Sequence, residues 1–358
     1  MNKRPFDDTD MALMADKRPR MHEDGELGAG NPSISGSDKQ LAIHQKRHSL
    51  KGPTMLLTGH DGEIFTAKFH PSGTSIASAG ADRSIFMWSA RGDCENYAIL
   101  KAAHSHTILE VQFSADGDHL FSCSADKIVI IWDSLTGCRL KKLRNHQSYI
   151  NSIATAPTDT KLLASVGDDC LVNVWDLRKR KSALTFKDNY QLTAVSFNKT
   201  NDQVMVGGIE NTINIWDLRK GGKHASLVGH TDTITGLSLS PDGHHLLSNS
   251  MDNTLKCWDV RPSTTDNSRL EKTLLGHHHN FEKNLLRCAW SPNQRLISAG
   301  SSDGLVHIWG YNSCDTLYQL PGHRSSVNEV VFSPKEPLVL SCSSDKQIYL
   351  GEIDYNLL

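Results

Sequence analysis

Histidine, serine, aspartate and tryptophan recur together at fixed distances along the chain. In four places a histidine is followed by a serine, an aspartate comes four residues after the serine, and a tryptophan six residues after the aspartate. Serine, histidine and aspartate are the side chains of the hydrolase triad, in which histidine takes the proton of the serine hydroxyl. Each set therefore has the residue types for nucleophilic chemistry. The sets are His60, Ser78, Asp82 and Trp88; His104, Ser122, Asp126 and Trp132; His146, Ser165, Asp169 and Trp175; and His230, Ser248, Asp252 and Trp258.

Repetition argues against that chemistry. An enzyme needs one triad, whereas this chain carries four equivalent sets, so we expect the groups to form structural hydrogen-bonded networks. The segment GSSDG at 300–304 matches a nucleophile elbow, but that motif requires a strand-to-helix turn and this one lies between two predicted strands. The run His277, His278 and His279 offers imidazoles without an accompanying set of cysteine or carboxylate ligands. We therefore expect no catalytic site, no cofactor and no metal.

The elements that must position these groups are short strands in a repeat of ~40–45 residues. Tryptophans stand at 88, 132, 175, 216, 258 and 309, each with an acidic residue six positions earlier, and a Gly-His or related pair precedes most units. Runs such as SIFMW and KIVIIW alternate with turn sequences such as SPDG, which is typical of antiparallel strands. The pattern resembles the WD repeat, whose units are four-stranded propeller blades. We expect an all-β fold, a seven-bladed WD-repeat β-propeller.

The N-terminal residues differ from the repeats. Residues 1–52 are rich in Gly, Ser, Asp and Pro and lack apolar periodicity, so we expect a flexible tail over 1–52 and a propeller over 53–358. The strand 54–57 precedes the first Gly-His pair, and we expect it to complete the seventh blade. The tail carries Lys17, Arg18 and Arg20, a basic cluster of the kind that nuclear import receptors bind.

Composition excludes several classes of function. The formal net charge is −2 over 358 residues, which lacks the basic excess needed to bind nucleic acid mainly through phosphates. No apolar run approaches the ~18 residues of a membrane-spanning helix, so we expect no membrane association. The eight cysteines are scattered without a CxxC pair, which indicates reduced thiols in the cytosol or nucleus.

Three repeats are irregular. The fourth has Val206 and Glu210 in place of serine and aspartate, the sixth is long and has Ala299 in place of serine, and the seventh has Gly351 in the tryptophan position. These irregularities, and the segments GDCENYA at 92–98, HNFEKNLLRC at 279–288 and SCSSDKQIYLGEI at 341–353, resemble the WD-repeat subunits of the spliceosomal U5 small nuclear ribonucleoprotein. The resemblance implies a non-enzymatic interaction scaffold of that particle, acting in nuclear pre-mRNA splicing.

The same resemblance implies the partners. A monomeric propeller would dock on the largest U5 protein, near the helicase and GTPase of the particle, and would associate with RNA mainly indirectly. An alternative is a substrate receptor of a cullin-type ubiquitin ligase, because WDLR at 175–178 and 216–219 and WDVR at 258–261 resemble the WDxR element of such receptors. Those arginines could equally pair with neighbouring carboxylates.

Partner-binding positions follow from the resemblance to WD propellers. Three positions in each repeat commonly face a ligand: three and five residues after the histidine, and the residue before the acid. Aromatic anchors dominate protein interfaces, so Phe65 and Tyr149 are the expected hot spots. The predicted partner-binding rim consists of Glu63, Phe65, Leu109, Tyr149, Asp168, Ile209, Met251, Ser302 and Ser344.

Overall fold

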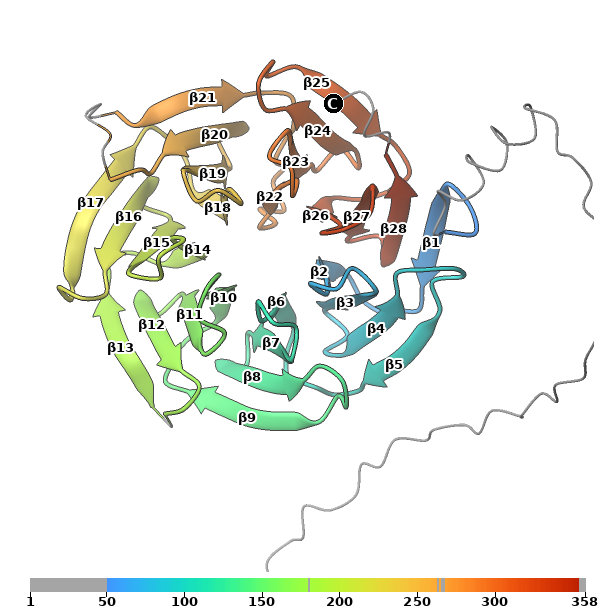
Figure 1. The fold of residues 1–358 in the computed structure, drawn as a ribbon, viewed down its shortest axis with the longest axis horizontal. Coiled ribbons are helices and arrows are strands. Elements are labelled where there is room, and N and C mark those ends of the chain that lie inside the picture. Colours follow the sequence, from blue (N-terminus) through green and yellow to red (C-terminus); the bar gives the residue numbers. More distant parts are fainter. Residues whose placement is uncertain (1–49, 180, 263, 265–267, 354–358) are drawn as a thin grey trace, which may run out of the picture. The chain divides into compact units, whose positions relative to one another are not determined.

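Seven four-stranded antiparallel sheets form a closed ring (Figure 1). The computed structural model describes residues 50–179, 181–262, 264 and 268–353, so Lys17, Arg18 and Arg20 lie outside the described residues. Within these ranges the chain forms strands and no helix, and therefore no helix that could cross a membrane. The predicted seven-bladed all-β propeller is confirmed.

Each blade contributes four strands, with the first at the centre of the ring and the last at its circumference (Figure 1). Blade 1 contains β2 (Ile64–Phe69), β3 (Ser75–Gly80), β4 (Ile85–Ser89) and β5 (Asn96–Leu100). Blade 2 contains β6 (Ile108–Phe113), β7 (His119–Ser124), β8 (Ile128–Asp133) and β9 (Arg139–Arg144). Blade 3 contains β10 (Ile150–Thr155), β11 (Leu162–Gly167), β12 (Leu171–Asp176) and β13 (Ser182–Lys187). Blade 4 contains β14 (Leu192–Phe197), β15 (Gln203–Gly208), β16 (Thr212–Asp217) and β17 (Gly222–Val228).

The remaining blades follow in the same order. Blade 5 contains β18 (Ile234–Leu239), β19 (His245–Ser250), β20 (Thr254–Asp259) and β21 (Leu270–Leu274). Blade 6 contains β22 (Cys288–Trp290), β23 (Leu296–Gly300), β24 (Val306–Gly310) and β25 (Thr316–Leu320). Blade 7 contains β26 (Val327–Phe332), β27 (Leu338–Ser343), β28 (Gln347–Glu352) and, as its outer strand, β1 (Thr54–Thr58).

Burial explains why the strands have these sequences. The second strand of a blade is covered on both faces by neighbouring blades, and β7 is accordingly apolar or small almost throughout. The outer strand has one face toward water, and β5 alternates between exposed and half-buried positions. The hydrophobic core is divided into clusters that each lie between two adjacent blades, so no blade buries its own apolar surface alone.

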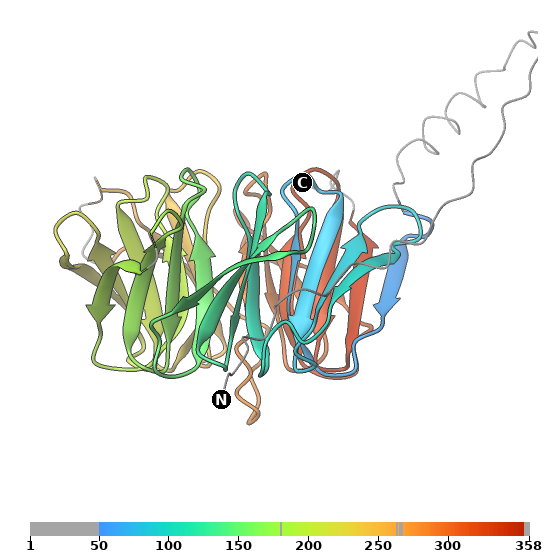
Figure 2. The same ribbon diagram turned by 90° about the horizontal axis from the view of Figure 1, so that it is seen from below.

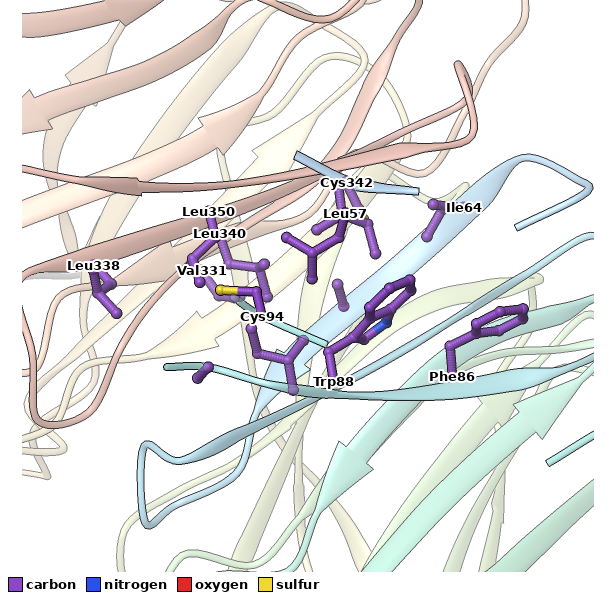
Figure 3. Packing of buried hydrophobic residues seen from close by; sticks show 14 of the residues in the cluster. Leu57, Ile64, Phe86, Trp88, Cys94, Val331, Leu338, Leu340, Cys342 and Leu350 are labelled. Atoms are coloured by element: carbon purple, nitrogen blue, oxygen red, sulfur yellow. The ribbon is translucent and has the colours of Figure 1, made fainter. Parts of the chain in front are cut away.

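The ring is closed by pairing the N-terminal strand with the C-terminal blade. β1 pairs antiparallel with β28, from Thr54 opposite Gly351 to Thr58 opposite Gln347. Leu57 is buried in the cluster between blades 7 and 1, where Figure 3 labels it beside residues of both blades. Because this strand covers the open edge of β28, it removes a site at which another chain could pair.

Residues 50–52, which the sequence analysis assigned to the tail, are described by the structure and lie next to blade 1. Leu50 forms a bridge with Gly92 and is only 6% exposed, and the Lys51 amide donates to the Gly92 carbonyl. Leu50 also belongs to the same cluster as Cys94. Residues 50–52 are therefore held against blade 1, although their sequence carries no strand pattern.

The ring has two ends, seen edge-on in Figure 2. One end, called the Gly-His face below, consists of the loops that lead into each first strand and the turns between second and third strands. These loops are 59–63, 101–107, 145–149, 188–191, 229–233, 275–287 and 321–326, and the turns are 81–84, 125–127, 168–170, 209–211, 251–253, 301–305 and 344–346. The other end carries the remaining turns of each blade.

Candidate functional site

Blade 1 brings its predicted tetrad together. His60 Nδ1 lies 2.6 Å from Asp82 Oδ2, and His60 Nε2 lies 2.7 Å from Ser78 Oγ. The indole of Trp88 donates to the same hydroxyl at 2.8 Å. The chain of hydrogen bonds connects the loop before β2 to the turn between β3 and β4, so it fixes the Gly-His face of the blade.

Blades 2, 3 and 5 repeat this arrangement. Their histidine-to-aspartate distance is 2.9 Å, their histidine-to-serine distances are 2.7–2.8 Å, and their indoles donate to the serine at 2.8–2.9 Å. In all four tetrads the serine is fully buried. A substrate carbonyl cannot reach a hydroxyl that is covered on all sides and already accepts a bond from tryptophan, so the geometry does not support a hydrolase.

Blade 7 holds a further set that the sequence analysis did not include. His323 lies 3.0 Å from Asp345 and 2.9 Å from Ser341. Gly351 occupies the tryptophan position and pairs with Thr54 of β1. Ser341 stands four residues before Asp345, the same spacing as in the tetrads, so the signal was present in the sequence.

The tetrad aspartates, Asp82, Asp126, Asp169 and Asp252, are held ionised. Burial alone would raise the pKa of each carboxyl, but hydrogen bonds from the histidine and from backbone amides outweigh it, so each pKa lies below its usual range. An ionised carboxylate can only accept a hydrogen bond, so Nδ1 of the histidine carries the proton and donates it to the aspartate. The tetrads are therefore stable at neutral pH as structural ties.

In the irregular blades, other residues occupy the positions of the tetrad. In blade 4 the Asn214 amide donates to Asp188 at 2.9 Å and to Glu210 at 3.1 Å, and so replaces histidine as the bridge. In blade 6, GSSDG at 300–304 forms the turn between β23 and β24, not a strand-to-helix turn. His277 is fully buried, and burial together with its neighbouring histidines lowers its pKa to about 3, so it is neutral.

One group in the described part of the chain combines three potential metal ligands. His245, Cys257 and Glu271 lie close together between the outer strands of blade 5. His245 Nδ1 is 2.9 Å from Glu271 Oε2, and the Tyr311 hydroxyl donates to the same carboxylate at 3.1 Å. The ammonium of Lys272 lies 3.9 Å from the centre of the Tyr311 ring. These contacts account for the cluster, and the adjacent cation disfavours a metal ion.

A β-bulge at the start of most first strands turns a side chain toward the next blade. At this position Asn151 donates to the Leu192 carbonyl at 2.8 Å, Thr193 donates to the Ile234 carbonyl, Thr235 to the Leu286 carbonyl at 2.9 Å, and Asn328 to the Ile64 carbonyl at 2.7 Å. Blades 1 and 2 have Phe65 and Leu109 here. The polar residues connect neighbouring blades by hydrogen bonds, which these two apolar side chains cannot donate.

Arg287 lies among the inner strands, where it lines the central channel. It directly precedes β22, and its guanidinium donates to the carbonyls of Asn151 at 2.6 Å, Thr193 at 3.1 Å and Thr235 at 3.0 Å. It also lies 3.4 Å from the Glu110 carboxylate, which is itself buried. One side chain therefore joins blades 2, 3, 4, 5 and 6 across the channel. No sequence motif indicated this role.

The predicted rim residues all lie at the Gly-His face but differ in exposure. Glu63, Tyr149 and Ile209 are exposed, and the others are half-buried. Leu109 packs against the cluster between blades 2 and 3, and Asp168 accepts a hydrogen bond from Asn151 at 2.6 Å. The half-buried members are Phe65, Leu109, Asp168, Met251, Ser302 and Ser344.

Two exposed aromatic residues of this face were not among the predicted site residues. Tyr190 lies in the loop before β14 and is 52% exposed, and Phe281 lies in the long loop before β22 and is 90% exposed. Both fall in repeats that lack the regular histidine spacing, so the family rule could not assign them. Among the described residues of the opposite end, Leu135 is the one large hydrophobic side chain that is exposed in a turn.

The arginines of the WDxR segments pair locally. Arg178 donates to Asp176 at 2.9 Å, Arg261 makes two contacts with Asp259 through its Nε and Nη2 atoms, and Arg219 lies 4.0 Å from Asp202. Their side chains lie at the turn that follows the third strand, at the opposite end from the Gly-His face.

Comparison with known proteins agrees with this architecture. The model of the family "WD domain, G-beta repeat" matches seven segments: 51–89, 96–133, 137–176, 180–217, 221–259, 268–310 and 314–350. The chain is 48% identical over 350 residues to the U5 small nuclear ribonucleoprotein 40 kDa protein of Mus musculus, covering 96% of this chain and 97% of that protein. It is 50% identical over 326 residues to the protein of the same name from Homo sapiens, covering 91% of each.

A more distant relative carries a related name. The chain is 40% identical over 313 residues to pre-mRNA-splicing factor cwf17 of Schizosaccharomyces pombe, covering 87% of this chain and 91% of that protein. The seven segments that the family model matches extend over the whole ring, including its irregular blades. The chain therefore belongs to the WD40-repeat family and, within it, to the family of U5 small nuclear ribonucleoprotein 40 kDa proteins.

Proposed function

We propose that this protein is a non-enzymatic docking scaffold of the U5 small nuclear ribonucleoprotein in pre-mRNA splicing, and that its Gly-His face contacts other proteins of the particle. The names of its relatives support membership of the particle. The observation that carries the docking role is the exposed apolar side chains of the Gly-His face, Tyr149, Tyr190, Ile209, Leu275 and Phe281. Soluble proteins seldom leave such groups uncovered on one face without a partner.

The chemistry of the ring supports a scaffold. The serines of the tetrads are buried and hydrogen-bonded, and the guanidinium of Arg287 in the channel is engaged by backbone carbonyls, so neither is free to react with a substrate. The chain has no excess of positive charge, which favours contact with protein over direct contact with RNA. The expected partners are the largest U5 protein and, nearby, the helicase and the GTPase.

Location in the nucleus follows from this role. Lys17, Arg18 and Arg20 are the proposed import signal. The ubiquitin-ligase alternative is less favoured because Arg178 and Arg261 are each occupied by a carboxylate two residues away.

The test is affinity purification of the tagged full chain from nuclear extract, with the co-purifying proteins and RNA identified. We expect U5 proteins and U5 RNA, with the RNA lost after the protein partners are removed by high salt. Recovery of cullin-ligase adaptors without spliceosomal proteins would contradict the proposal and favour the alternative.

A further inference from the structure

The loop between β21 and β22 projects from the Gly-His face. In Figure 2 this light-brown segment extends beyond the other loops at the lower edge of the ring. Its tip consists of Phe281, Glu282 and Lys283, all exposed, with Phe281 among the most exposed large hydrophobic residues of the described chain. A phenylalanine in that position contributes nothing to the core, and an exposed aromatic side chain at a projecting tip suits a binding surface.

The base of the loop is held firmly on both sides. On the first side, the His279 amide donates to Asn253 at 2.7 Å and His277 Nε2 lies 2.7 Å from the Asn249 side-chain oxygen. On the second side, the Leu286 carbonyl accepts from the Asn249 amide at 3.1 Å, and Leu286 itself is buried.

Asn249 is fully buried and therefore ties the two sides of the loop together. Arg287, the next residue of the chain, anchors the second side in the channel. An anchored base positions the tip in advance, which reduces the entropy lost on binding.

The surroundings of the tip are acidic. In the Gly-His loops and turns of blades 3 to 6, called the acidic sector below, the charged residues are acidic except Lys283 and the buried Arg287. Three cations adjoin them: the ammonium of Lys256 donates to the Gly229 carbonyl, and the exposed Arg144 and Lys187 end the strands before two of the loops. The acidic sector comprises 145–149, 168–170, 188–191, 209–211, 229–233, 251–253, 275–287 and 301–305. It also contains the five exposed large apolar side chains of the described Gly-His loops and turns, Tyr149, Tyr190, Ile209, Leu275 and Phe281. Blades 7, 1 and 2 carry both signs of charge there, including Arg83 and Arg324.

From this combination we infer that the acidic sector, with Phe281 as its anchor, docks a basic segment of a partner protein that carries an apolar socket for the phenylalanine ring. The inference rests on the proposed function and specifies the face and the chemistry of the partner. Complementary charge guides encounter, and the buried aromatic ring supplies affinity. RNA is disfavoured as the occupant because the carboxylates repel its phosphates.

The first test measures binding. Phe281→Ala in the full chain should weaken binding to the purified U5 protein assembly by about tenfold or more, as expected for an aromatic anchor. The matched control is Leu135→Ala, because Leu135 is 94% exposed at the opposite end and should bind like the wild type. Circular dichroism and melting temperature should be unchanged for both, since neither side chain is in the core.

The second test concerns charge. Asp232→Lys, at an exposed position of the acidic sector, should slow association and make binding less sensitive to salt, whereas Asp118→Lys at the opposite end should not. Equal binding by the Phe281→Ala variant and the wild type would overturn the inference while leaving the proposed function intact. Failure of the wild type to bind any U5 protein would instead refute the proposed function.

The third test identifies the occupant. A photoreactive phenylalanine analogue at position 281 of the full chain is irradiated in the U5 particle, and the crosslinked peptide is sequenced. We expect a protein segment with Lys or Arg beside apolar residues, and no such crosslink from position 135. Crosslinks to RNA, or to residues 1–49 of this chain, would overturn the inference.

Discussion

Replacing Asp126 with alanine tests whether a tetrad is structural. The carboxylate accepts from His104 Nδ1 at 2.9 Å, from the Ser105 amide at 3.1 Å and from the Ile128 amide at 3.1 Å. The His104 ring has no exposed surface, so the substitution leaves a buried polar nitrogen without a partner, which costs ~1–3 kcal/mol. The two amides lie nearer the surface and can bind water. We therefore expect Asp126→Ala to lower the free energy of unfolding by about 2 kcal/mol.

Urea denaturation followed by tryptophan fluorescence measures this loss, with Asp133→Ala as the control. Asp133 ends β8 and accepts from the Leu135 and Thr136 amides at 2.9 and 3.0 Å, but both donors belong to an exposed turn and neither is a buried partner. Its replacement should cost less than about 1 kcal/mol. Equal losses for the two variants would refute the reasoning. A stable Asp126→Ala protein that had lost a hydrolytic activity would refute the scaffold interpretation altogether.

Three further predictions concern closure, the channel and pH. Deleting residues 1–49 should leave the melting temperature unchanged, whereas deleting residues 1–58 removes β1, exposes the edge of β28 and should cause aggregation in light scattering. Arg287→Met should cost about 3–5 kcal/mol in urea denaturation, because it removes the cation beside the buried Glu110 carboxylate, which keeps only hydrogen bonds from Gln112 and the Ile153 amide, and adding Glu110→Gln should restore part of the loss. The pKa of His277 is about 3 in the folded protein against 6.5 when unfolded. As the pH falls below 6.5 the unfolded chain takes up a proton that the buried ring does not, so the free energy of unfolding decreases, whereas above pH 6.5 this residue costs no stability. Between pH 7 and pH 5 the wild type should lose about 2 kcal/mol more than His277→Gln in the same assay.

Most of the fold could be predicted because the residues that define each blade recur at a constant spacing along the chain. Tryptophans and acidic residues at a constant spacing define the blades, and turn sequences define the strand ends. The same period groups His60 with Ser78, Asp82 and Trp88 before any geometry is known. The pairing of β1 with β28 follows from the order of strands, since a closed ring needs a partner for the last edge.

The channel and the acidic sector could not be predicted in this way. Arg287 contacts carbonyls that are far from it in sequence, and only the closed ring brings them within reach. Phe281 lies in an insertion without a periodic counterpart, so no rule of the repeat assigns its exposure. Conversely, the rule placed Leu109 on the rim, but its side chain is half-buried against the core between blades 2 and 3.

Amide hydrogen exchange tests the central claim most directly, by comparing the free protein with the same protein in the purified U5 particle. The account predicts slower exchange in the particle over the acidic sector, above all in the segments 147–149, 189–191, 209–211 and 278–284. Exchange at the opposite end, including the turn around Leu135, should be unchanged. Protection confined to the outer strands or to that opposite end, with the acidic sector exchanging as in the free protein, would contradict the claim.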